Sequence, residues 1–211
     1  MLTRLLHRFQ RRTPEPVKVI FGLGNPGRQY EATRHNVGWW VLDHLADVWH
    51  FDGWRRDGEA LTASGQVRAN RVRLVKPLTY MNLSGQVLKP YLRRPFWAPK
   101  TDLLVVVDDV ALPLGRYRLR SRGSSGGHNG LKSVEHHLKS QEYGRLRVGI
   151  KPADERREVG QLADFVLSPF GKAERADVVA LLPRLTDSVE TWLDEGIEAA
   201  MNKFNNETNL A

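Results

Sequence analysis

The chain has 211 residues, of which 41% are hydrophobic and 27% are charged, and these proportions exclude a fibrous repeat or global disorder. The length predicts one domain. The absence of cysteine excludes disulfides, thiolate chemistry and cysteine-ligated metal sites, and a reducing cytoplasm is the expected compartment. No apolar run approaches the roughly 18 residues needed to cross a bilayer. The net charge of +8 favours a polyanionic partner such as nucleic acid.

Residues 1–16 form a separate segment with four arginines, one acidic residue and two prolines at its end. We expect a disordered basic arm. A transit peptide is the alternative, because four apolar side chains would share one helical face (Leu2, Leu5, Leu6 and Phe9), but the segment lacks serine. The folded domain is expected over residues 17–205, followed by a tail at 206–211.

From Val17 onward, the hydrophobic pattern predicts alternating strands and helices. Strands are expected at 17–24, 71–77, 103–109, 116–120 and 145–150. Helices are expected at 36–49, about 129–139 and about 172–203, the last interrupted near Pro183. The apolar run that begins at Leu103 is typical of a strand covered on both faces. The order predicts a single α/β domain, with a mixed twisted sheet flanked by helices on both faces.

A glycine motif follows the first expected strand. Gly22, Gly24 and Gly27 match the dinucleotide fingerprint G-x-G-x-x-G. In that fold the helix opens within the glycines, but here Pro26 and the polar residues 28–36 delay it. The sequence therefore disfavours a nicotinamide or flavin site.

A second glycine-rich segment, Gly123 to Gly127, matches the nucleophile-elbow pattern G-x-S-x-G around Ser125. A nucleophile elbow follows a buried strand, whereas this loop follows arginines at alternate positions (Arg116, Arg118, Arg120 and Arg122). The expected strand after the loop repeats this spacing with Arg145, Arg147 and Lys151. The two strands predict a phosphate-binding surface; a solvated face is the alternative.

Five polar residues lie where expected strands or helices begin or end: Asn25, His35, Asn82, Asp108 and Asn129. Open α/β sheets bind their ligands at such positions. One histidine, one carboxylate and three amides form an acid–base site without a nucleophile, so the attacking group would be water.

Four segments together are recognisable: VIFGLGNPGRQYEATRHNVG, KPLTYMNLSG, VVVDDVALPLG and GSSGGHNGLKSVEHHL. In this order and spacing they closely resemble the bacterial-type peptidyl-tRNA hydrolases, over about residues 17–204. The resemblance implies hydrolysis of the ester between a peptide and the 3′ ribose of tRNA, which recycles tRNA from prematurely released peptidyl-tRNA. It also implies a monomeric, cytoplasmic enzyme without a metal or another cofactor.

The resemblance also implies roles for individual residues. It implies that His35 is the catalytic histidine, that Asp108 is its partner and that Asn25 is a further catalytic residue. The residues implied to bind the substrate are Tyr30, Met81, Asn82 and Asn129, and those implied to bind tRNA are Arg120 and Arg147. No expected catalytic position is substituted.

In the expected reaction His35 removes a proton from water, while Asp108 accepts a hydrogen bond from the other ring nitrogen. Two other classes stay open. One is a binding module that uses the same basic face without catalysis, against which the complete set of histidine, aspartate and asparagines argues. The other is a serine hydrolase that uses Ser125, which insensitivity to a fluorophosphonate would exclude.

Overall fold

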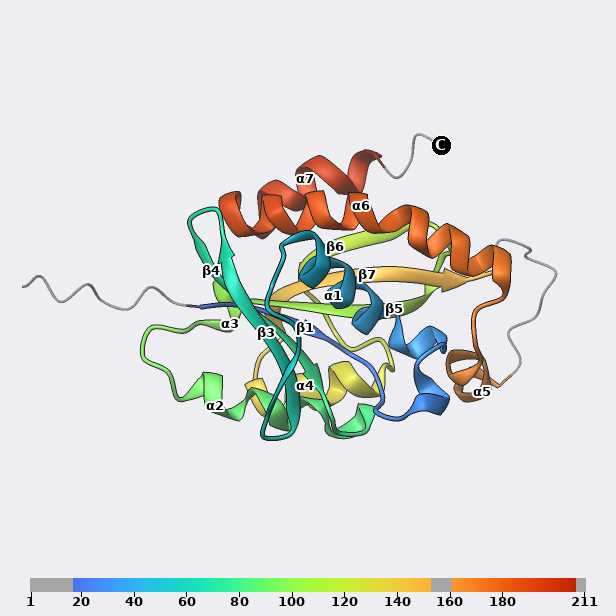
Figure 1. Cartoon of the computed structure of the whole chain (residues 1–211), viewed down its shortest axis with the longest axis horizontal. Coiled ribbons are helices and arrows are strands. Elements are labelled where there is room, and N and C mark those ends of the chain that lie inside the picture. Colours follow the sequence, from blue (N-terminus) through green and yellow to red (C-terminus); the bar gives the residue numbers. More distant parts are fainter. Residues whose placement is uncertain (1–16, 153–160, 208–211) are drawn as a thin grey trace, which may run out of the picture.

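The computed structural model describes residues 17–152 and 161–207 (Figure 1). The arm expected at 1–16 and residues 208–211 of the expected tail lie outside the described residues. The last described helix ends at Glu207, so positions 206 and 207 belong to a helix. None of the described helices is long and apolar enough to cross a membrane.

The centre of the molecule is a seven-stranded mixed sheet with the order β2-β3-β4-β1-β5-β7-β6. β1, β4, β5 and β7 are mutually parallel neighbours, and the antiparallel strands lie toward the two edges. The strands are β1 (Lys18–Gly22), β2 (Arg55–Asp57), β3 (Ala60–Val67), β4 (Asn70–Pro77), β5 (Leu103–Pro113), β6 (Tyr117–Arg122) and β7 (Glu142–Lys151). The predicted α/β class and mixed sheet are confirmed, whereas β2 and β3 were not among the expected strands.

Helices cover both faces of this sheet (Figure 1). One face packs against α1 (Val37–Val48), α6 (Lys172–Glu195) and α7 (Ile197–Glu207). The other packs against the 3-10 helix η3 (Met81–Leu88), α2 (Lys89–Leu92) and α4 (Asn129–Leu138). The remaining short elements are η1 (Arg28–Tyr30), η2 (Arg34–Asn36), α3 (Pro99–Asp102) and α5 (Leu162–Leu167).

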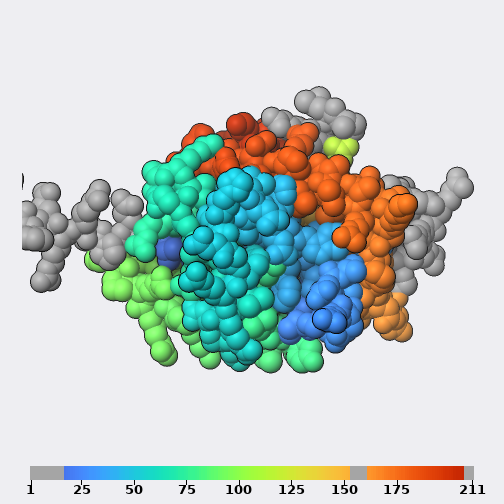
Figure 2. Space-filling model, viewed as in Figure 1, coloured from blue at the N-terminus to red at the C-terminus, as the bar shows by residue number. Residues whose placement is uncertain are grey.

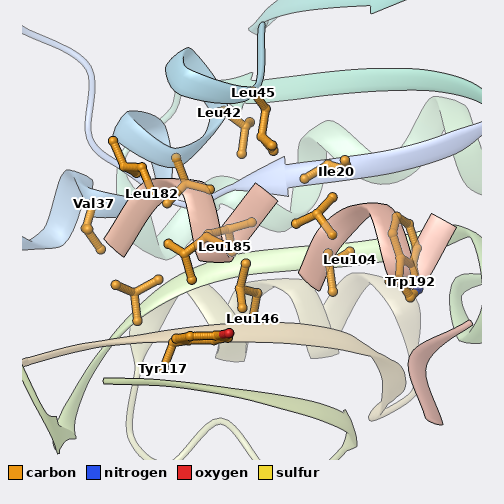
Figure 3. Packing of buried hydrophobic residues seen from close by; sticks show 14 of the residues in the cluster. Ile20, Val37, Leu42, Leu45, Leu104, Tyr117, Leu146, Leu182, Leu185 and Trp192 are labelled. Atoms are coloured by element: carbon orange, nitrogen blue, oxygen red, sulfur yellow. The ribbon is translucent and has the colours of Figure 1, made fainter. Parts of the chain in front are cut away.

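The larger core lies between the sheet and α6 (Figure 3). Leu182 and Leu185 on α6 and Leu42 and Leu45 on α1 point toward the sheet, and all four are buried. Burying such aliphatic side chains contributes about 1.5–3 kcal/mol each. The core therefore fixes α1 against the sheet, and η2 directly precedes α1.

The expected interruption of the last helix near Pro183 is wrong. Pro183 lies inside α6, which continues to Glu195, and the break falls at Gly196, whose φ of 88° ends the helix. A proline removes one helical hydrogen bond. Here Leu181, Leu182 and Leu185 pack into the core around it and hold the helix together, so burial outweighs that loss.

Candidate active site

His35 and Asp108 meet where the central strand β1 ends, on the side of the sheet toward which the parallel strands run. Asp108 lies within β5, His35 lies in η2, and Nδ1 of His35 is 2.9 Å from Oδ1 of Asp108. Close packing of α1 brings them together: a Cβ on Gly38 would lie 2.6 Å from the carbonyl oxygen of Leu23 and 2.7 Å from that of Val106. Only glycine allows the start of α1 to lie this near the strand ends.

A second histidine binds the same carboxylate oxygen. Nε2 of His128 lies 2.9 Å from Oδ1 of Asp108. His128 is also the N-cap of α4, where its Nδ1 accepts hydrogen bonds from the backbone N–H groups of Gly130 and Leu131 at 3.1 and 3.3 Å. Since Nδ1 is an acceptor, the ring proton is on Nε2 and is donated to Asp108.

These hydrogen bonds keep Asp108 ionised and fix which ring nitrogen of His35 carries the proton. Burial by itself would raise the pKa of Asp108, but the neighbouring His128 and His35 rings more than offset it and hold that pKa below the ordinary range. The ionised carboxylate accepts the Nδ1 proton of His35. The lone pair of His35 is therefore on Nε2, the nitrogen that can act as a base.

A network of asparagines holds the loop that follows β1. The backbone N–H of Asn25 donates to Oδ1 of Asn36, and Nδ2 of Asn36 donates to the carbonyl of Asn25, both at 2.9 Å. Oδ1 of Asn25 then accepts from the backbone N–H of Met81 at 2.8 Å. Asn36 is fully buried and follows His35 in sequence, so the network ties Asn25 and Met81 to the histidine.

A cleft of about 320 Å³ opens over the histidines. Among the predicted site residues, His35, Asp108, Asn129 and Arg147 line it. Its further walls include the glycine loop around Ser125 and three side chains of α5 (Leu162, Ala163 and Val166). The cleft thus joins the acid–base group to one predicted amide and one predicted tRNA-binding arginine.

The other predicted residues do not line this cleft. Asn25 and Met81 are buried and joined by the hydrogen bond above. Asn82 is exposed on η3 beside Met81, and Tyr30 ends η1. The structure therefore brings four of the nine predicted residues into the cleft wall.

A larger basic cleft of about 990 Å³ adjoins the first one. It is lined by Arg120, Arg122 and Arg147, and it shares Arg147, Ser125 and Gly126 with the smaller cleft. Arg147 is held by an ion pair of 2.8 Å with Asp109. Arg120 and Arg147, the two arginines predicted to bind tRNA, thus lie in one groove that leads to the histidines.

Arg145 departs from the predicted pattern of phosphate-binding arginines. It is only 2% exposed, it pairs with Glu135 at 3.3 Å, and its guanidinium lies 4.2 Å from the ring centre of Tyr143. Its cross-strand neighbour Arg120 is exposed instead. Arg145 therefore stabilises the wall of the groove.

Ser125 shares the cleft wall with His35 but is not hydrogen-bonded to it. Within residues 17–152 and 161–207, no hydrogen bond joins the Ser125 hydroxyl to a histidine, and both histidines bind Asp108 instead. The strand that precedes the loop, β6, is an edge strand. This geometry argues against the serine-hydrolase alternative.

His35, Asp108 and His128 could also offer one ligand atom each to a metal ion, since these atoms lie within 4.8 Å of one another. A metal on Nε2 of His128 would place the ring proton on Nδ1, where two backbone N–H groups already donate. The donor set therefore fits a hydrogen-bonded group better than a metal centre.

Two residues of this site, His128 and Asn36, were not identified from sequence. His128 immediately precedes the helix expected from Asn129 and therefore occupies the N-cap position. A polar side chain at that position is a sequence signal for a helix cap. Asn36 directly follows His35, but nothing in the sequence indicates that its amide would bind the backbone of Asn25.

Comparison with known proteins agrees with this arrangement. The family model described as peptidyl-tRNA hydrolase matches residues 19–211. A peptidyl-tRNA hydrolase of Gemmatimonas aurantiaca is 60% identical over 188 residues, which cover 89% of this chain and 99% of that protein. One of Brevibacillus brevis is 43% identical over 90% of this chain and 98% of that protein.

A solved structure also matches. The crystal structure of peptidyl-tRNA hydrolase from Acinetobacter baumannii superposes with a TM-score of 0.79 at 32% identity, over 90% of this chain and 95% of that one. The likeness therefore covers nearly the whole described chain.

The two functions of His128 can be separated by substitution. His128→Asn keeps a good N-cap but loses the donor to Asp108, whereas His128→Ala loses both. We expect both variants to lower the hydrolysis rate, and only His128→Ala to lose a further 0.5–2 kcal/mol or so of unfolding free energy. Denaturant unfolding and single-turnover kinetics check this. Wild-type turnover by His128→Asn would show that the bond to Asp108 is dispensable.

Proposed function

The chain belongs to the peptidyl-tRNA hydrolase family and hydrolyses peptidyl-tRNA, and we propose that His35 is the general base for the attacking water. The observation that carries the proposal is the bond between Nδ1 of His35 and the ionised Asp108. It orients the ring at the edge of the cleft with Nε2 as its unprotonated nitrogen.

In the proposed reaction, a water molecule at Nε2 of His35 gives its proton to the ring and attacks the ester carbonyl. The ring becomes an imidazolium, which the adjacent Asp108 carboxylate stabilises. The protonated Nε2 then donates its proton to the departing 3′ oxygen of the ribose. The ester C–O bond breaks, and a free peptide carboxyl group and a tRNA hydroxyl result.

The amide side chains bind the peptide in this proposal. Asn129 lines the cleft, and Asn82 lies on η3 next to Met81. Primary amides donate to carbonyl oxygens and accept from peptide N–H groups, so they can hold a peptide backbone whatever its side chains. Asn25 supports them by fixing the backbone of Met81. Met81 and Tyr30 are proposed to contact the substrate as well.

Arg120 and Arg147 bind phosphate groups of the tRNA in this proposal. They line the groove that opens into the catalytic cleft, so a nucleic acid strand held there would deliver its end to His35. We further propose that the enzyme is monomeric, cytoplasmic and independent of metal ions. The backbone N–H groups of Gly130 and Leu131 donate to Nδ1 of His128, and this supports metal independence, because a metal on Nε2 would require the ring proton to be on Nδ1.

Replacement of His35 tests the base directly. His35→Ala is expected to lower kcat by a factor on the order of 10² to 10⁴, the usual contribution of a general base, while tRNA binding survives. The measurement is peptide release from N-acetyl-aminoacyl-tRNA, with tRNA affinity measured separately. Turnover within a few-fold of wild type would contradict the assignment.

Chelation tests metal independence. Incubation with excess EDTA is expected to leave kcat/KM unchanged, because the nitrogens and carboxylate of the candidate ligand set already bind one another. The control is the same assay after added zinc. Loss of activity in EDTA that zinc restores would overturn this part of the proposal.

A further inference from the structure

A basic and aromatic surface lies at the opposite end of the molecule from α5, where the loop between α2 and α3 projects (Figure 1). We name it the distal surface and define it by the exposed residues Arg71, Arg93, Arg94 and Phe96. It borders a hollow of about 440 Å³. Figure 2 shows the start of β1 in dark blue between the teal β3–β4 hairpin and the green segment after α2.

The loop that carries the distal surface is fixed in place. Nε1 of Trp97 donates to the carbonyl of Val17 at 3.1 Å, and the Trp97 ring packs against Tyr91 with 5.8 Å between ring centres. The guanidinium of Arg94 lies 5.0 Å from the centre of the Tyr91 ring. The loop therefore presents Arg94 in a defined position beside the hollow.

Phe96 is unusual both in backbone and in exposure. Its φ of 63° lies in the left-handed region, which favours glycine, and the residue is 75% exposed. The fold thus holds a large apolar ring in water next to two arginines. Exposed aromatic rings beside guanidinium groups are typical of surfaces on which nucleotides stack.

The charge of this surface is not neutralised. In the described part of the chain, Arg71, Arg93 and Arg94 form no ion pair, whereas Arg73 beside them pairs with Asp57. Arg71 and Arg94 both line the hollow. Guanidinium groups that converge on a hollow without a carboxylate partner attract phosphate.

The basic cleft leads from the catalytic cleft toward this surface, and we call the path along it from Asp108 to Val17 the track. The catalytic and basic clefts share the wall formed by Ser125, Gly126 and Arg147. At its other end the basic cleft is lined by Lys18, and Val17, the preceding residue, lines the distal hollow. The track runs at least the length of β5 from Leu103 to Asp108, on the order of 17 Å.

We propose that the distal surface is a second RNA-binding site that contacts the body of the tRNA while its ester lies at His35. Arg71 and Arg94 bind phosphates, and Phe96 packs on a nucleotide that is not base-paired. The inference rests on the proposed function, because it takes peptidyl-tRNA as the molecule that follows the track.

The test compares two substrates at several salt concentrations: N-acetyl-aminoacyl-tRNA, and the same aminoacyl ester on a CCA trinucleotide. The charge variant is Arg71→Ala with Arg94→Ala. The matched control is Arg184→Ala with Lys203→Ala, which removes the same charge from α6 and α7 on the other face of the sheet. Arg120→Ala with Arg147→Ala is the positive control.

The charge variant is expected to raise KM for the tRNA substrate without changing kcat. The log–log salt slope should fall by about 1.4–1.8, because each lost phosphate contact removes about 0.7–0.9. Phe96→Gly, which suits the positive φ, should raise KM roughly five-fold or more with little change in slope. Hydrolysis of the trinucleotide ester should stay at the wild-type rate in the charge variant and in Phe96→Gly.

An unchanged KM and salt slope on the tRNA substrate would overturn the proposal. Equal losses on both substrates would point to altered folding, and Arg71→Lys with Arg94→Lys then decides, since retained charge must restore the slope if phosphates bind there. A wild-type enzyme that hydrolyses neither substrate would instead refute the hydrolysis of peptidyl-tRNA on which the inference rests. The two failures are therefore distinguishable.

Discussion

The catalytic account depends on one constraint: two imidazole rings donate hydrogen bonds to the same oxygen of a buried carboxylate. His35 comes from η2 and His128 from the start of α4, and both reach Oδ1 of Asp108 at 2.9 Å. Burial makes the negative charge costly unless donors surround it, so the two rings and the carboxylate are stable only together. The ring of His35 is thereby held in the orientation in which its other nitrogen is a base.

The fold supplies this constraint through the order of its strands. β5 lies between β1 and β7, so the loop after β1 and the start of α4, the helix that precedes β7, both reach the carboxylate. Gly38 lets α1 approach these central strands closely enough to bring η2, and with it His35, to Asp108. The antiparallel pair of β6 and β7 then places the arginine groove next to the histidines. Chemistry and RNA binding are thus adjacent but carried by different residues.

Much of this could be predicted from sequence, because hydrophobic period and element ends are local properties. His35 lies at such an end, in η2 just before α1, whereas β5 continues past Asp108 to Pro113 instead of ending near it as expected. The resemblance to a family gave the implied roles of both residues. That His35 and His128 bind the same oxygen of Asp108 depends on distances between segments far apart in the chain, so sequence could not predict it. The burial of Arg145 depends on Glu135 across the fold, and Pro183 stays helical because its neighbours are buried. Neither follows from spacing alone.

The most direct test of the central claim is the single-turnover rate of Asp108→Asn on bound N-acetyl-aminoacyl-tRNA. An asparagine Oδ1 can still accept from both rings, so the geometry is kept while the charge that stabilises the imidazolium is lost. The account predicts a fall on the order of 10² to 10⁴ with tRNA affinity unchanged. The neighbouring Asp109→Asn, whose carboxylate pairs with Arg147, should mainly alter affinity. A folded Asp108→Asn enzyme that reacts within a few-fold of the wild-type rate would contradict the account.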